Sequence, residues 1–278
     1  MLLVLDNMEH LLEDVSLVSE ILRMAPGVRL LVTSRERLNL MGEWVFDIQG
    51  LPVPEDEIDG ELEGYSAVRL FAQTARQALV GFEMTPENRA AIVRICRLVE
   101  GAPLGLHLAA SWVRTLTCDE IAQEIERSLD FLKSSAVDIP ERQRSLRAAF
   151  EHSWRLLPSG EQAALRRLSV FRGGFTRQGA EEVAGGTLPV LSALVDKSLL
   201  RRVSTGRFEI HDLLRQYTAE KLSEGELADV LERHSGYFLR RVAEREADLK
   251  SERQLEVLQE LAPETENIRS AWKWAVDN

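Results

Sequence analysis

A carboxylate at the end of an apolar run is the first candidate for chemistry in this sequence. Residues 2–6 read LLVLD, so Asp6 directly follows a short hydrophobic segment. In an open parallel sheet, ligands bind at the carboxyl ends of the strands. A carboxylate there can orient Mg²⁺, usually through water, beside the β- and γ-phosphates of a nucleotide. Asp6 is therefore a candidate magnesium residue, and the alternative is a buried strand whose final Asp only caps a helix.

A second apolar run ends in groups that can bind phosphate. Residues 30–35 read LLVTSR, so Ser34 and Arg35 follow the hydrophobic stretch. A guanidinium at a strand end can hold a terminal phosphate through paired hydrogen bonds and so report its presence. A surface arginine is the alternative interpretation. Asp6 and Arg35 together indicate a phosphate site more specifically than either residue does alone.

Two short motifs lie further along the chain. Residues 100–106 read EGAPLGL, in which Pro103 and Leu104 open an apolar helix after a glycine turn. A proline at the first helical position is also ordinary helix chemistry. Residues 210–212 read IHD, in which Asp212 can cap the following helix.

The hydrophobic pattern predicts the elements that position these groups. The two apolar runs are typical of strands buried on both faces of a parallel sheet, and apolar residues between them recur at helical spacing until Pro26-Gly27. Strand, helix and strand with this crossover length form a βαβ unit. A third strand is expected at Trp44–Ile48, and from about residue 66 the pattern is helical.

A further unit begins near residue 141, where three helices precede a β-hairpin. This order is typical of a winged helix. The expected helices span 161–169, 177–183 and 188–197, and the expected strands span 199–203 and 207–210. Beyond Asp212 the pattern is helical to the last residues.

In this order the motifs resemble those of STAND-class (NB-ARC-like) signal-transduction ATPases, in the branch of bacterial LuxR-type and AfsR-type transcriptional regulators. LLVLDN resembles Walker B, LLVTSR sensor one, GAPLGL the GLPL box and IHD the MHD box. The segment from Glu260 to Val276 is similar to the start of a TPR-like array. The resemblance covers nearly the whole chain and implies an α/β fold that becomes mainly α.

The resemblance implies four parts. Residues 1–64 would be the C-terminal part of a nucleotide-binding α/β domain, a partial parallel-sheet P-loop NTPase core. Residues 65–140 would form a helical domain with the GLPL-like box. Residues 141–212 would form a winged helix that ends in the MHD-like box, and residues 213–278 a helical linker with the start of a TPR-like helical array.

The resemblance also implies roles at the catalytic end of the site. Asp6 would orient Mg²⁺, and Asn7 would stand where many relatives carry a second acid. Because an amide cannot act as a general base, rapid hydrolysis through Asn7 is not expected. Arg35, next to Ser34, would sense the γ-phosphate.

The remaining implied contacts concern the base and ADP. Pro103 would pack on the adenine face with Leu104 behind it. His211 would contact the β-phosphate of ADP and so lock the winged helix onto the nucleotide domain.

The phosphate loop of this family is missing. Such a loop needs Gly-x-x-x-x-Gly-Lys-Ser/Thr, because backbone amides and a lysine hold the phosphates. None of the 17 glycines is followed by lysine. We therefore expect no ATP hydrolysis by this chain alone, and we interpret the sequence as a truncated form whose upstream P-loop segment is absent; a true P-loop-less relative is the alternative.

The composition argues against nucleic-acid-binding, membrane and metal-binding classes of protein. The chain has 278 residues, 45% hydrophobic and 28% charged, with a net charge of −11. Because Lys and Arg bind phosphate backbones, this acidic balance disfavours general nucleic-acid binding. No run approaches the roughly 18–20 apolar residues of a membrane span, so no membrane partner is expected. Cys96 and Cys118 lack metal-ligand spacing and indicate a reducing cytoplasm.

The leading hypothesis is a switch in which ADP or ATP, with Mg²⁺, controls docking of the winged helix. Its partners would be the upstream P-loop segment, downstream helical repeats, an inducer or protein ligand of the array, and DNA only through an effector domain not present here. One alternative is a protein-binding helical scaffold without nucleotide. The other is a winged-helix DNA-binding protein, suggested by the arginines Arg166, Arg167, Arg172, Arg177, Arg201, Arg202 and Arg207.

Overall fold

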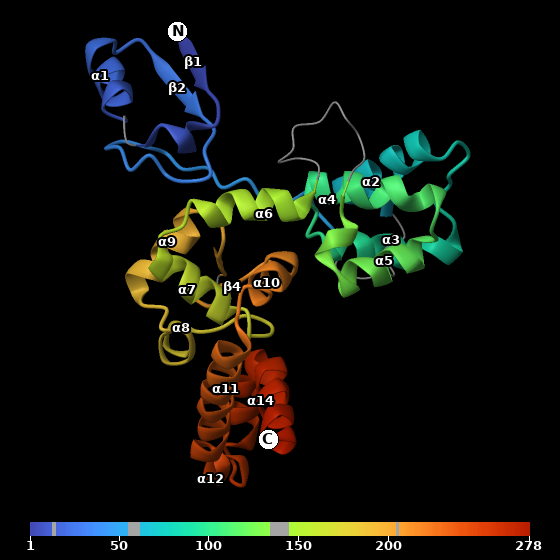
Figure 1. Ribbon diagram of the computed structural model, residues 1–278, viewed down its shortest axis with the longest axis vertical. Coiled ribbons are helices and arrows are strands. Elements are labelled where there is room, and N and C mark those ends of the chain that lie inside the picture. The colour runs from blue at the N-terminus through green and yellow to red at the C-terminus, as the bar shows by residue number, and fades with distance from the viewer. Residues whose placement is uncertain (13–14, 55–61, 134–144, 204–205) are drawn as a thin grey trace.

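The computed structural model describes residues 1–12, 15–54, 62–133, 145–203 and 206–278. Over these residues the chain is mainly helical, with two small two-stranded sheets (Figure 1). None of the described helices has both the length and the apolar character needed to cross a membrane.

The N-terminal unit is a parallel strand pair with one crossover helix. Strand β1 (Leu2–Leu5) pairs with β2 (Arg29–Val32), with Leu2 opposite Arg29 and Leu5 opposite Val32. Helix α1 (Ser16–Met24) connects them, and the 3-10 turn η1 (Met8–His10) follows β1. The predicted βαβ unit is confirmed, and the register brings the ends of both strands to one edge.

The predicted third strand is wrong. Residues 44–48 form no strand, and Trp44, Phe46 and Ile48 are 96%, 88% and 83% exposed. A β-prone sequence becomes a strand only where a neighbouring edge accepts its backbone hydrogen bonds. No described strand pairs with this segment, so its apolar side chains stand in solvent.

The strand pair itself is poorly covered. Side chains alternate between exposed and half-buried along both strands, and Leu2, Val4 and Leu31 are more than half exposed. Parallel sheets are normally covered on both faces. The N-terminal unit therefore carries apolar surface that other chain segments normally bury.

A helical bundle follows, and it confirms the helical pattern predicted from about residue 66. Pro86 is the first residue of its helix and follows the Thr85 cap. Cys96 and Cys118 are free and buried, and burial raises the pKa of their thiols to about 12 and about 11. The elements are η3 (Leu62–Gly64), α2 (Ser66–Ala78), α3 (Pro86–Leu98), α4 (Pro103–Ala110), η4 (Ser111–Arg114), α5 (Cys118–Arg127) and η5 (Leu129–Phe131).

The next unit contains the predicted helices and a short antiparallel pair. Phe175 bridges to Phe208, which extends the pair by one contact, and Phe171 and Phe175 are buried beneath it. The elements are α6 (Leu146–Arg155), α7 (Ser159–Leu168), α8 (Arg177–Ala184), α9 (Leu188–Asp196), β3 (Arg201–Arg202), β4 (Phe208–Glu209) and α10 (Asp212–Ala219).

The C-terminal unit is a helical layer. In it α11 and α14 pack side by side, with α12 at the far end (Figure 1). Its elements are α11 (Glu224–Glu244), α12 (Glu246–Leu249), α13 (Gln254–Leu261), η7 (Ala262–Glu264) and α14 (Thr265–Asp277).

Helix α6 is held on α10 by a polar cluster. Glu151 on α6 accepts hydrogen bonds from the hydroxyl of Tyr217 at 2.5 Å and from Nζ of Lys221 at 3.0 Å. Arg147, one turn earlier, donates to both carboxylate oxygens of Glu220 at 2.7 and 2.9 Å and pairs with Asp130 of η5. The cluster therefore fixes α6 to α10 and to the preceding bundle.

This cluster makes stability depend on pH. The hydrogen bond from Tyr217, with that from Lys221, lowers the pKa of Glu151 from 4.5 to about 2. A carboxyl with a depressed pKa stabilises the fold above its unfolded pKa, and that stabilisation is lost as the pH falls toward the folded value. We expect the difference in unfolding free energy between wild type and Glu151→Gln, measured by urea denaturation, to shrink from pH 5 to pH 2. Glu232→Gln, at an exposed position, serves as control. If the unfolding free energies of wild type and Glu151→Gln change with pH in parallel, the role of the Glu151 carboxylate is contradicted.

Candidate functional site

The ends of β1 and β2 meet at a polar edge. The hydroxyl of Thr33 donates to Asp6 Oδ1 and accepts from the backbone N–H of Asn7 at 3.1 Å. The N–H of Met8 donates to the Thr33 carbonyl at 3.0 Å. Asn7 adopts a left-handed conformation with φ 58°, which asparagine tolerates better than most residues. The turn after β1 is thereby fixed, and the exposed Asp6 carboxylate lies beside Thr33.

Arg35 lies at the same edge but reaches α6. Its Nη1 donates to Ser153 Oγ at 2.6 Å and to the carbonyl of Ala149 at 3.3 Å. Its Nε lies 3.8 Å from Glu9 Oε1. The guanidinium is therefore committed to α6 and to the turn after β1. Ser34 makes a local bond, in which its hydroxyl accepts from the N–H of Glu36 at 3.2 Å.

The residues after Arg35 bind the end of α9. Arg37 Nε lies 3.0 Å from Asp196 Oδ1. Lys197 Nζ lies 3.1 Å from Glu161 and 3.8 Å from Glu36. The charged segment Arg35–Arg37 thus attaches the strand pair to α6 and α9.

The GLPL-like turn is built on close backbone contacts. The carbonyl oxygen of Gly101 accepts a hydrogen bond from the N–H of Leu51 at 2.9 Å. Glu100, the residue before it, has a left-handed backbone conformation with φ 47°. Pro103 begins α4 and is exposed, while Leu104 is half-buried against the core. The exposed ring of Pro103 leaves a face on which a planar group can pack.

His211 contacts this turn. As the residue before α10, its Nδ1 accepts the N–H of Leu213 at 3.1 Å, and the same nitrogen lies 3.9 Å from Glu100 Oε1. Arg201 on β3 also lies near Glu100. The carboxylate of Glu209, which it hydrogen-bonds, and the charge of Glu100 both raise the pKa of Arg201. The turn that begins at Glu100 and the IHD motif that begins at Ile210 therefore lie together, although 110 positions (210 minus 100) separate these two residues in the chain.

The predicted residues form two groups. Asp6, Asn7, Ser34 and Arg35 share one edge, and the turn of Pro103 and Leu104 meets His211 in the other group. Among the described residues, no direct hydrogen bond or ion pair joins the two groups. The roles predicted for these residues stay predictions.

The edge at Asp6 fits a magnesium ion held through water. One of its carboxylate oxygens accepts from Thr33 and the side chain is exposed, and Mg²⁺ typically keeps several waters and takes one or two carboxylates. Within the described part of the chain, no group of three or more His, Cys, Asp or Glu is placed to hold a metal. Asp6 would supply one ligand and would need phosphate oxygens beside it.

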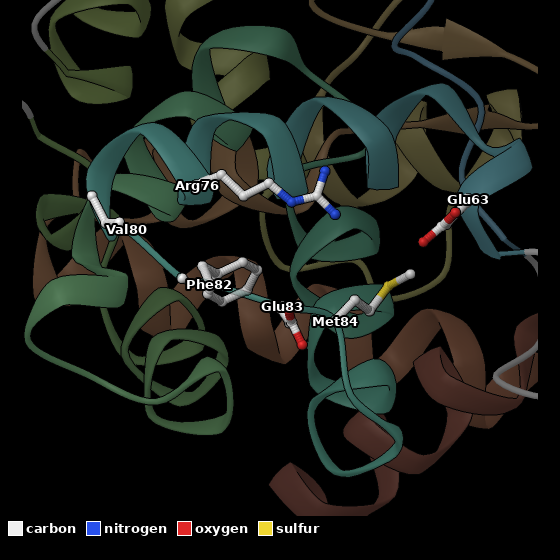
Figure 2. A pocket seen from close by; sticks show the side chains of 7 residues that line it. Glu63, Arg76, Val80, Phe82, Glu83 and Met84 are labelled. Atoms are coloured by element: carbon white, nitrogen blue, oxygen red, sulfur yellow. The ribbon is translucent and has the colours of Figure 1, made fainter.

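Two surface hollows lie elsewhere. One, of about 530 Å³, is lined by Glu63, Arg76, Phe82, Glu83 and Met84 at the end of α2 (Figure 2). The other, of about 430 Å³, lies on α13 and α14 and includes Leu258 and Trp272. Neither contains a predicted site residue.

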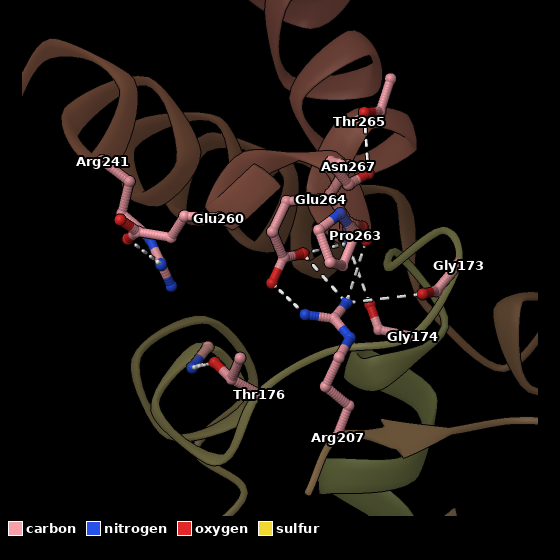
Figure 3. Close-up of polar contacts among 12 residues, drawn as sticks. Gly173, Gly174, Thr176, Arg207, Arg241, Glu260, Pro263, Glu264, Thr265 and Asn267 are labelled. Atoms are coloured by element: carbon pink, nitrogen blue, oxygen red, sulfur yellow. Dashed lines mark hydrogen bonds and ion pairs between the residues drawn. The ribbon is translucent and has the colours of Figure 1, made fainter. Parts of the chain in front are cut away.

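A buried polar joint connects the hairpin to the C-terminal helices. Arg207 pairs with Glu264 and donates to the carbonyls of Gly173 and Pro263 (Figure 3). Asn267 donates to the carbonyl of Gly174 and to Glu264, both at 2.9 Å. The Arg207 and Glu264 side chains are 13% and 4% exposed, so this ion pair is shielded from solvent.

Sequence reasoning missed several of these residues. The missed residues each contact a partner far away in the chain, which sequence spacing does not reveal. They are Glu9, Glu100, Ser153 and Glu264. The run Ser34-Arg35-Glu36-Arg37 carried a signal, because it places three charges directly after an apolar run.

Comparisons with known proteins agree with the motifs. No family model matches the chain. It is 33% identical, over its whole length, to a predicted HTH-type transcriptional regulator of Mycobacterium tuberculosis, of which it spans 32%. It is 28% identical over 78% of its length to the regulatory protein AfsR of Streptomyces griseus, of which it spans 21%. This chain is a homologue of AfsR-type bacterial regulators. The predicted resemblance to AfsR-type regulators is thus confirmed, and the chain spans about a third or less of these relatives.

One solved structure also resembles part of this chain. It is a signal transduction ATPase with numerous domains (STAND) and a tetratricopeptide repeat sensor from Pyrococcus horikoshii. The identity is 20% and the TM-score 0.33, over 86% of this chain and 30% of that one.

The GLPL-like turn generates a stability prediction. A Cβ on Gly101 would lie 2.0 Å from the Leu51 carbonyl oxygen, and its φ is +67°. Gly81 has a φ of +87° with nothing within 4 Å of an added Cβ. Gly81→Ala should cost about 1–2 kcal/mol of unfolding free energy through backbone strain alone. Gly101→Ala should cost clearly more, because the Leu51 backbone must also move; equal losses in urea denaturation would contradict the close contact.

Proposed function

We propose that this AfsR homologue is part of a cytoplasmic, nucleotide-dependent signalling switch of a transcriptional regulator. ADP or ATP with Mg²⁺ would set the docking of a winged helix, formed by α7–α9 and the β3–β4 hairpin, on the nucleotide-binding parts. The observation that carries the proposal is the meeting of Glu100, in the GLPL-like turn, with His211. A nucleotide bound between the turn and α10 would bridge the two.

The strand edge supports the nucleotide part of this proposal. Parallel pairing places Asp6, Thr33 and Arg35 at the carboxyl ends of β1 and β2, where open α/β sheets bind ligands. Asp6 would orient Mg²⁺ and Arg35 would respond to the terminal phosphate. The amide of Asn7 supplies no general base, so binding and sensing are favoured over rapid hydrolysis.

The exposed apolar surface supports a larger nucleotide domain. Trp44, Phe46 and Ile48, with half of the β1 and β2 side chains, stand in solvent. Large exposed apolar side chains in such number suggest a surface that another segment covers. We propose that an upstream segment with the phosphate loop covers it, and that further helical repeats continue the layer of α11–α14.

The arginines of the hairpin unit favour an intramolecular role over DNA binding. Arg166 and Arg167 both donate to Glu226 at 2.8 and 2.7 Å. Arg207 is paired with Glu264, and Arg201 donates to Glu209 at 2.7 Å. Since binding to DNA phosphates requires free cationic groups, arginines that are paired in this way suit a lever within the protein. DNA would be contacted by a separate effector domain.

Nucleotide binding tests the proposal. The genomic DNA before Met1 is first read in frame for Gly-x-x-x-x-Gly-Lys-Ser/Thr, and the longest in-frame product that contains this chain is then purified. Binding is measured with fluorescent nucleotides and Mg²⁺. Arg35→Ala should weaken ATP binding by about tenfold relative to ADP binding. His211→Ala should weaken ADP binding relative to ATP binding by a similar factor.

A matched histidine controls that experiment. His107 is exposed on α4 and bonded to Thr74 at 2.9 Å, so His107→Ala should leave both affinities unchanged. If the product binds neither nucleotide, or if both variants weaken ATP and ADP equally, the switch is excluded.

DNA binding gives the opposite test for the winged-helix alternative. We expect the chain to show no salt-dependent affinity for a labelled random duplex, because most hairpin arginines already pair with carboxylates. Measurable affinity that falls with salt and disappears in the double variant Arg201→Ala, Arg202→Ala would instead establish a DNA-binding wing.

A further inference from the structure

The hollow at the end of α2 brings together charged side chains that have no partner. It measures about 530 Å³ and is lined by η3, α2 and the loop that leads to α3 (Figure 2). Arg76 extends from α2, Glu63 belongs to η3 and Glu83 to the loop. Among the described residues, the charged groups of these three side chains form no hydrogen bond or ion pair. One cation and two anions are therefore free to bind a ligand.

The apolar part of the hollow is fixed to the core of the bundle. Phe82 and Met84 line the hollow and pack, partly buried, against the core. The Phe82 ring meets the buried Phe71 ring edge to face, with ring centroids 6.3 Å apart. An aromatic ring and a thioether together form a polarisable surface on which an apolar or aromatic group packs well. The hollow thus combines free charges with an apolar contact surface.

The loop that carries Phe82 and Glu83 is held in place by its own hydrogen bonds. The N–H of Phe82 donates to the Leu79 carbonyl at 3.1 Å, and Gly81 between them has a left-handed φ of 87°. Nδ2 of Asn88, on α3, donates to the Glu83 carbonyl at 3.0 Å. Because the loop is already ordered, a ligand that enters the hollow need not order it, and less free energy of binding is lost.

The charges of the hollow select the chemical class of the ligand. The Arg76 guanidinium and the Glu63 carboxylate come from different elements and both point into the hollow (Figure 2). A guanidinium binds a carboxylate through paired hydrogen bonds, and a carboxylate accepts hydrogen bonds from an ammonium group. A ligand that carries both groups satisfies both side chains. A ligand with a single charge leaves one of them without a partner.

We propose that this hollow binds a small zwitterion with an apolar side chain, of the α-amino-acid class. Arg76 holds the carboxylate of the ligand, Glu63 and Glu83 hold its ammonium group, and the apolar side chain lies on Phe82 and Met84. A volume of about 530 Å³ lies within the range of about 300–1,000 Å³ that is usual for small-molecule sites. The site is independent of the proposed nucleotide function, because it contains none of the residues predicted to bind nucleotide.

The first test titrates L-phenylalanine into the 278-residue chain labelled with methyl-¹³C methionine. Met84 lies in the hollow, whereas the other four of the five methionines are at or before Met41. We expect the Met84 methyl signal to shift in a saturable way in the NMR spectrum and the other four to stay in place. L-Phenylalaninamide lacks the carboxylate and 3-phenylpropionate lacks the ammonium group. Each analogue should bind at least about fivefold more weakly, the equivalent of one exposed charge contact.

The second test removes the charges of the protein. Arg76→Gln, and Glu63→Gln combined with Glu83→Gln, should each weaken L-phenylalanine binding by about fivefold or more. Because all three side chains are exposed, these variants should unfold in urea as wild type does. Arg69→Gln is the matched control, since Arg69 is also exposed on α2 but donates to Ser66 at 3.3 Å and lies outside the hollow. Its affinity should equal that of wild type.

Three results would overturn the proposal. The first is a Met84 signal that does not move up to the solubility limit of L-phenylalanine. The second is equal affinity for L-phenylalanine and either analogue, which would show that one charge of the ligand is not recognised. The third is unchanged binding in the Arg76 variant or in the Glu63 and Glu83 double variant. Presence or absence of nucleotide binding bears on the proposed function alone.

Discussion

Three consecutive residues after β2, Arg35 to Arg37, hold the strand pair on the rest of the molecule. The pair cannot hold itself there by burial, because its strands alternate between exposed and half-buried side chains. The attachment depends instead on charged side chains that reach Ser153, Asp196 and Lys197. Contacts of this kind are weaker than a packed core and depend on which anions are near, so the N-terminal unit is the part that a charged ligand can displace most easily.

The joint at the other side of the hairpin is built differently. Arg207 and Glu264 are nearly enclosed, whereas the Arg35 side chain is 37% exposed. Breaking a buried ion pair by removing one partner typically costs about 3–5 kcal/mol, while exposed pairs contribute about 1 kcal/mol or less. Asn267 adds two further hydrogen bonds at the buried joint. Movement should therefore concentrate at residues 35–37, and the hairpin should move as one body with η7 and α14 of the C-terminal layer.

The sequence predicted local structure better than it predicted contacts. The βαβ unit and the helices around the hairpin followed from periodicity, which is a local property. The strand at Trp44–Ile48 was wrong because pairing depends on a neighbour that propensity does not reveal. Arg35 was identified as a functional arginine, but its partner Ser153 lies 118 positions away, and no spacing rule relates the two.

Helix α10 connects the two groups of predicted site residues. His211 stands before its first turn and contacts Glu100, while Tyr217 further along the same helix binds Glu151 on α6. Glu151 lies two positions before Ser153, which holds Arg35. The residue predicted to contact ADP and the residue predicted to sense ATP are thus joined through two short helices. Because helices transmit displacement as rigid elements, a change at either end must be accommodated at the Glu151–Tyr217 contact. The low pKa of Glu151 reflects how strongly its ionised form is held at that crossing.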